Sequence, residues 1–77
     1  MLARFIQWLD ENKFRYELNG NGTSVFVLFD CGYYIRASDF RTDGTCYIRD
    51  TGFCEYTSVF ELTQRVLNYK NREKENR

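Results

Sequence analysis

The chain has 77 residues, no proline, no histidine, eleven basic and eleven acidic side chains, and therefore a formal charge of zero. A chain this short has too little interior to divide, so we expect a single domain over residues 1–77, with a folded core at 1–69 and a frayed charged tail at 70–77. The hydrophobic content of 43% excludes a disordered segment, and the balanced charge gives no basic field for non-specific nucleic-acid binding.

The first segment has the periodicity of an amphipathic helix. Arg4 and Gln7 interrupt its apolar residues, so it resembles neither a signal peptide nor a membrane span, and we expect a cytoplasmic protein. The apolar positions at helical spacing, Leu2, Phe5, Ile6 and Leu9, predict a helix over residues 2–12.

The next two segments have the patterns of β-strands. Residues 14–18 alternate between apolar and polar side chains, which predicts a half-buried strand. Two Asn-Gly pairs at 19–22 favour a tight reversal, and residues 24–30 are apolar on both parities. We therefore expect residues 24–30 to form an inner strand that runs antiparallel to the first.

A third strand, which starts at Tyr33 and ends at Phe40 or Arg41, precedes the clearest hairpin signal, Thr42-Asp43-Gly44-Thr45. If Asp43 and Gly44 are the two central residues, Phe40 lies opposite Tyr47 and Ser38 opposite Arg49. A turn at 50–52 then leads to a short strand over 53–56. This register places Tyr33, Ile35, Ala37, Cys46 and Ile48 on the core face, and Tyr34, Arg36, Ser38, Phe40, Tyr47 and Arg49 on the other.

The last segment begins with a capping box, Ser58-Val59-Phe60-Glu61, which predicts the start of a second helix. Its apolar stripe consists of Val59, Leu62, Val66 and Tyr69, widened by Phe60 and Leu67. The predicted fold is α+β: a helix, an antiparallel meander of three to five strands, and a helix, in two layers with both helices on one face of the sheet.

The residues that commonly carry catalysis or hold metals are scarce. Histidine is absent, and no hydrolase, P-loop or zinc-protease motif is present, so we interpret the chain as not an enzyme and expect no cofactor. Cys31, Cys46 and Cys54 lack a C-x-x-C spacing, so we expect reduced thiols and no metal site. Acidic residues near strand ends are either turn formers or a negative patch; they are Asp30, Asp39, Asp43, Asp50 and Glu55.

The sheet face away from the helices is the predicted partner-binding surface. Aromatic rings and guanidinium groups dominate the energetics of protein interfaces, and the same groups stack unpaired bases and contact phosphates. They also serve as ordinary cross-strand stabilisers, and the lack of an RNP-like run disfavours direct nucleic-acid binding. The predicted binding residues are Tyr34, Arg36, Phe40, Tyr47 and Arg49.

In its overall pattern the chain resembles the small, aromatic-rich proteins of bacteriophages and mobile elements, anti-CRISPR proteins among them. The resemblance covers the whole chain and involves no specific motif, and the neutral charge departs from the strongly acidic members of that type. It implies an inhibitor or adaptor that sterically occupies a surface of a larger host protein, nuclease or nucleoprotein complex. Pairing of the sheet with a second copy in a homodimer is an open alternative.

Overall fold

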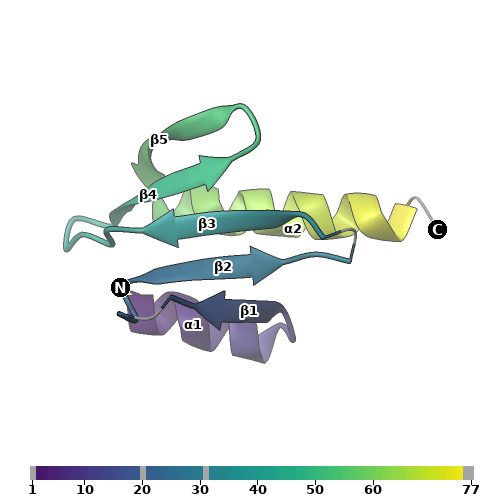
Figure 1. Ribbon diagram of the computed structural model, residues 1–77, viewed down its shortest axis with the longest axis horizontal. Helices are drawn as coiled ribbons and strands as arrows, with labels where there is room; N and C mark the ends of the chain where they lie inside the picture. Colours follow the sequence, from purple (N-terminus) through teal and green to yellow (C-terminus); the bar gives the residue numbers. More distant parts are fainter. Residues whose placement is uncertain (1, 20, 31, 76–77) are drawn as a thin grey trace.

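A helix, five strands and a second helix follow one another in the computed structural model, which describes residues 2–19, 21–30 and 32–75 (Figure 1). Strand order across the sheet equals strand order in the chain, and all neighbouring strands are antiparallel, so the predicted α+β meander is confirmed. The elements are α1 (Leu2–Glu11), β1 (Arg15–Leu18), β2 (Ser24–Leu28), β3 (Tyr34–Ser38), β4 (Thr45–Asp50), β5 (Phe53–Ser58) and α2 (Val59–Glu75).

Helix α1 ends in a Schellman motif. Lys13 has a φ of 60°, and its amide donates to the Asp10 carbonyl at 3.1 Å, while the Phe14 amide donates to the Leu9 carbonyl at 2.9 Å. These bonds satisfy carbonyls at the end of the helix and turn the chain directly into β1.

Helix α2 starts at the predicted cap. The Glu61 amide donates to the Ser58 hydroxyl at 3.0 Å, whereas the Glu61 carboxylate lies 3.5 Å from Arg65.

The prediction that Phe60 widens the apolar stripe of α2 is wrong, because Phe60 is 71% exposed. Each helical residue is rotated by about 100° from the one before it, so Phe60 points away from the side on which Val59 packs against the core. The helix continues to Glu75, so the described part of the predicted tail is helical. Neither helix in the described ranges is long and apolar enough to cross a membrane.

Both helices pack against the same face of the sheet, as predicted (Figure 1). One buried cluster joins residues from α1 and α2 to alternate residues of the three inner strands, and Trp8 stacks at its margin on Phe5 and Phe14. The buried cluster consists of Phe5, Leu9, Val25, Val27, Phe29, Ile35, Ala37, Cys46, Ile48, Leu62 and Val66.

The β4–β5 connection is the tight turn that the sequence indicates. Asp50 pairs with Phe53, which leaves Thr51 and Gly52 as the two turn residues, and Gly52 has a φ of 75°. This is a backbone conformation that glycine adopts at low cost. Strand β5 extends two residues beyond the predicted end at Tyr56, to Ser58.

The predicted register of β3 and β4 is wrong by two residues. Ser38 pairs with Tyr47 and Arg36 with Arg49, whereas the hairpin reading pairs Ser38 with Arg49. The cause lies in the turn: the Gly44 amide donates to the Arg41 carbonyl, so the residues at the centre of the turn are at positions 42 and 43. Gly44 then follows with a φ of 88°, the arrangement of a turn with a bulge.

The prediction that Phe40 lies on the solvent-facing side is also wrong. Asp39 has a φ of 50°, which ends β3 and redirects the chain, so that the Phe40 ring packs 5.9 Å from the Phe5 ring on the helix side. A left-handed residue changes the direction of a strand, so the alternation of faces does not continue past it.

Candidate functional site

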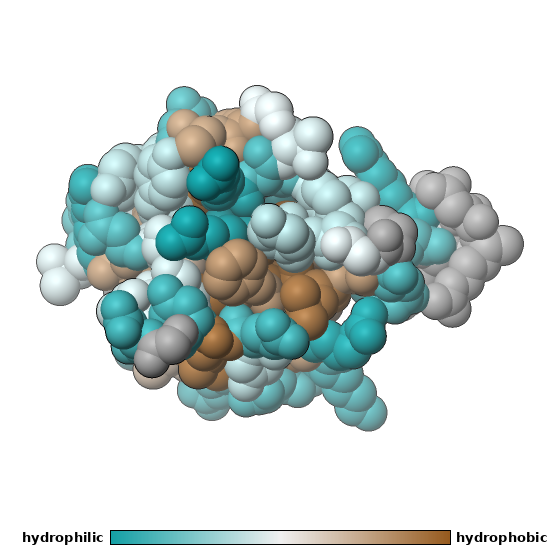
Figure 2. Space-filling view, viewed as in Figure 1, coloured by the Kyte–Doolittle hydropathy of each residue, from teal (hydrophilic) through white to brown (hydrophobic). Residues whose placement is uncertain are grey.

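The sheet face that the helices leave uncovered is the candidate site, and it is called the open face below. Its side chains form rows across neighbouring strands, because directly paired residues share a face. Apolar and hydrophilic groups are mixed over the centre of this view (Figure 2). One row crosses all five strands and contains Glu17, Phe26, Arg36, Arg49 and Cys54.

Four of the five predicted binding residues lie on the open face. Tyr34 and Arg36 come from β3, and Tyr47 and Arg49 from β4. Phe40 does not join them, because it packs against the core beside Phe5 on the helix side. Whether any of these residues contacts a partner remains a prediction.

The sequence interpretation missed two aromatic residues of this face. Phe26 lies on β2 opposite Arg36, and its ring meets that of Tyr34 edge-on at 5.4 Å. Tyr56 lies on β5 opposite Tyr47, and its side chain is 45% exposed. Residues 24–30 are apolar on both parities, so the sequence pattern does not single out Phe26 as a residue of the open face.

Arg36 and Arg49 form a pair of like charges at directly opposed positions, called the arginine pair below. The Arg36 guanidinium lies 5.7 Å from the centre of the Phe26 ring. In the described part of the chain, no ion pair involves either guanidinium, and the shielded Nε of Arg36 has no hydrogen-bond partner. The arginine pair therefore presents positive charge that no ion pair in the described chain compensates.

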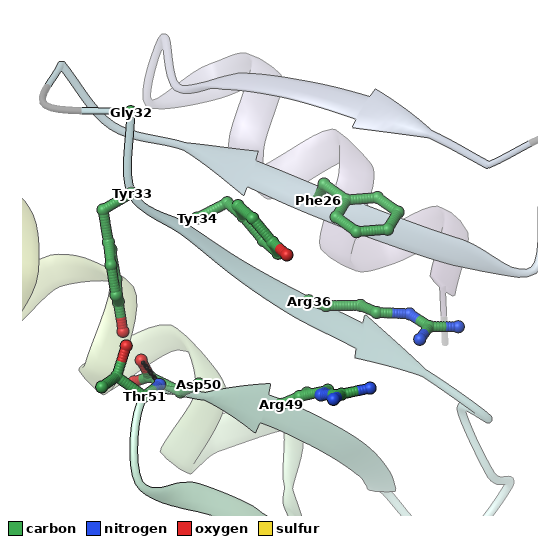
Figure 3. Close-up of a pocket in the computed structure, with 8 residues that line it drawn as sticks. All are labelled: Phe26, Gly32, Tyr33, Tyr34, Arg36, Arg49, Asp50 and Thr51. Carbon is green, nitrogen blue, oxygen red and sulfur yellow. Dashed lines mark hydrogen bonds between the residues drawn. The ribbon is translucent and has the colours of Figure 1, made fainter.

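The arginine pair borders a hollow of about 600 Å³. Figure 3 shows both arginine side chains extending side by side from β3 and β4, with the rings of Phe26 and Tyr34 nearby and Tyr33 reaching toward Thr51. The hollow opens to solvent, and aromatic, cationic and acidic residues all contribute to its lining. The lining residues are Phe26, Gly32, Tyr33, Tyr34, Arg36, Arg49, Asp50 and Thr51.

The β5 side of the open face is held by hydrogen bonds. The Tyr47 hydroxyl and the Cys54 thiol share one, which raises the pKa of Tyr47. The Tyr56 hydroxyl donates to the Asp39 carboxylate, which raises the pKa of Tyr56, and Arg41 lies 3.8 Å above the Tyr56 ring. These contacts orient both rings.

The acidic residues near the turns are engaged in contacts within the chain. Asp43 accepts from the Thr45 hydroxyl at 2.6 Å and from the Thr45 amide at 3.0 Å, and these bonds lower the pKa of Asp43. Asp50 accepts from the Thr51 amide, and Asp30 pairs with Arg15 at 3.1 Å. Among the residues with a described position, no three potential metal ligands come together.

The cysteines occupy different environments. Cys46 is a buried free thiol whose pKa burial raises to about 11, and Cys54 is an exposed free thiol on the open face. Cys31 lies outside the described residues.

Comparisons with protein-family models, with curated proteins and with solved structures find no match to this chain.

Proposed function

We propose that the chain is a protein-binding module that uses its open face, without catalysis, to occupy a surface of a larger protein. The observation that carries the proposal is the uncovered sheet face, on which Tyr34 and Tyr56 are about half exposed beside the arginine pair. Tyrosine and arginine are the residue types that most often dominate binding energy, because they combine large rigid area with specific polar contacts.

The packing of the face also supports this function. The helices bury one side of the sheet only, so a partner can dock on the other side without disturbing the core. The hollow beside Phe26 and Tyr34 has room for an anchoring side chain of the partner. Preordered rings lower the entropy cost of association, and contacts within the chain orient Tyr47 and Tyr56.

The proposed mode of action is steric. The resemblance to small phage-encoded inhibitors makes a host nuclease the first partner class to examine, and free thiols at Cys46 and Cys54 suit a reducing, cytoplasmic compartment. An inhibitor of this kind blocks its target at a stoichiometric ratio, so titration of nuclease activity measures the effect directly.

The decisive experiment begins with capture of a partner by the tagged chain from nuclease-treated bacterial lysate, followed by binding with both purified components. The double variant Tyr34→Ala/Tyr56→Ala is expected to weaken the complex at least about tenfold, the effect of losing one or two interface anchors. The matched control is Phe60→Ala, which removes an exposed ring from α2, outside the open face. Undiminished binding by the folded double variant would contradict the proposal.

A second function, single-stranded nucleic-acid binding, is favoured by one observation. Phe26 and Tyr34 lie beside the arginine pair, so stacked bases and phosphates would have neighbouring partners. This function predicts binding of an oligothymidylate with an affinity that falls steeply as salt is added. Salt-insensitive or absent binding would remove it.

A further inference from the structure

The arginine pair is unusual because no carboxylate in the described chain forms an ion pair with it. Residues directly opposed on antiparallel strands lie close together, and like charges there destabilise a sheet. Three other arginines show the contrast: Arg15 pairs with Asp30, Arg41 with Asp39, and Arg65 with Asp50 and Glu61. Arg36 and Arg49 are opposed without such a carboxylate.

The donor atoms of the arginine pair are available to an anion. A guanidinium carries five N–H donors in a planar fork, which fits the two oxygens of a carboxylate or a phosphate. The Nε of Arg36 is shielded from water and has no acceptor in the described chain, so the terminal N–H groups of the two guanidiniums are the donors that an incoming oxygen reaches. Both arginines border the hollow, which leaves space for the anion and the group that carries it (Figure 3).

The charge of the surroundings distinguishes the two kinds of anion. A nucleic-acid strand presents a phosphate at every nucleotide and requires a basic track, whereas this chain has zero net charge and Glu17 lies on the same row as the arginine pair. A local pair of cations flanked by aromatic rings suits one or two carboxylates.

We infer that the arginine pair is an oxyanion-binding site, and that it takes an aspartate or glutamate carboxylate from an acidic segment of the partner protein. The inference rests on the proposed function for its choice of a protein carboxylate. The two guanidiniums bridge the carboxylate oxygens, and the anion relieves the repulsion between the opposed strands.

The test is a titration of the ¹⁵N-labelled 77-residue chain with a capped hexaglutamate peptide, followed through the NMR signals of the arginine Nε–H groups and of the backbone amides. Saturable shifts centred on Arg36 and Arg49 are expected, with about tenfold weaker binding in both Arg36→Gln and Arg49→Gln. Arg36→Lys keeps the positive charge but lacks the planar set of N–H donors of a guanidinium. Its affinity for the peptide is expected to lie between that of Arg36→Gln and that of the unaltered chain. Arg15→Gln is the matched control, because Arg15 lies on the same face but is paired with Asp30.

Four results would overturn the inference. Shifts that never saturate, or an equal loss in Arg15→Gln, would reduce the effect to diffuse charge attraction. Tighter binding of a ten-nucleotide oligothymidylate through the same two arginines would make phosphate the ligand. The peptide titration of the unaltered chain can fail while Tyr34→Ala/Tyr56→Ala still loses partner capture. That result would contradict the carboxylate site and would leave the proposed function in place.

Discussion

The Tyr56 hydroxyl donates to the carboxylate of Asp39, the residue whose left-handed backbone ends β3. The bond joins the edge strand β5 to the β3–β4 loop, across the intervening strand β4. Arg41 completes the contact, because its guanidinium lies over the Tyr56 ring and 3.6 Å from the Asp39 carboxylate. The loop is therefore fastened to the sheet by side chains as well as by its backbone.

Removal of the hydroxyl in Tyr56→Phe is expected to loosen this loop while leaving the ring under Arg41. Amide exchange at Arg41 and Gly44, which donate to Thr45 and Arg41, should become roughly three- to tenfold faster, as loss of one hydrogen bond predicts. Hydrogen exchange followed by NMR measures this. Unchanged protection of both amides would show that the backbone alone orders the loop.

Phe40→Ala is expected to destabilise the fold by about 2 kcal/mol, because Phe40 packs against Phe5 and its removal leaves a partial cavity. Phe60→Ala should change the free energy of unfolding by less than about 0.5 kcal/mol, since that ring is largely exposed. Urea unfolding of the two variants makes the comparison. Equal, small changes in the free energy of unfolding for both variants would show that Phe40 lies at the surface and does not pack against the core.

Arg49→Gln is expected to stabilise the isolated protein, because it removes the repulsion with Arg36. At low salt the melting temperature should rise by about 2–4 °C, and the gain should vanish near about 1 M salt, where charges are screened. Calorimetry at both salt concentrations checks this. A lower melting temperature at low salt would indicate that the arginine pair is already compensated.

The Cys46 thiol makes the stability depend on pH in the alkaline range. Burial raises its pKa from 9.0 to about 11, so the thiol stays protonated to a higher pH in the folded state than in the unfolded state. The stabilisation is complete below pH 9 and is lost as pH rises from about 9 toward 11, at about 1.4 kcal/mol per unit.

Comparison with Cys46→Ala tests this dependence, because the tyrosine residues titrate in both proteins and their contribution cancels. The free energy of unfolding of the unaltered chain should fall more steeply between pH 9 and 10.5 than that of the variant, on the order of 1 kcal/mol more. Parallel pH profiles would contradict the burial effect.

Local signals in the sequence were sufficient for most of the fold. Three predicted features that depend only on residues close together in the chain are confirmed. They are the apolar stripe with Phe5 and Leu9, the helix cap at Ser58 and the turn at Gly52. The β3–β4 register was missed because a shift of two residues keeps every side chain on its own face. A test of face consistency therefore accepts both registers.

The candidate site was predictable only where strict alternation held. Tyr34, Arg36, Tyr47 and Arg49 follow the parity of their strands, whereas Phe40 comes after the left-handed Asp39 and departs from it. Aspartate tolerates that conformation, but the residue type alone does not reveal it. Arg36 and Phe26 are neighbours because β2 and β3 pair in one particular register, and no local pattern in the sequence determines that register.

Helix α2 follows all five strands in the chain, yet Leu62 and Val66 cover part of the apolar side of the sheet. During translation the strands emerge before this cover, and a nascent chain that ends at β5 presents buried residues such as Ile35 and Ile48 to water. The interval is one in which hydrophobic association and chaperone binding compete with folding. Completion of the buried cluster thus requires the helix, because Leu62 and Val66 are part of that cluster.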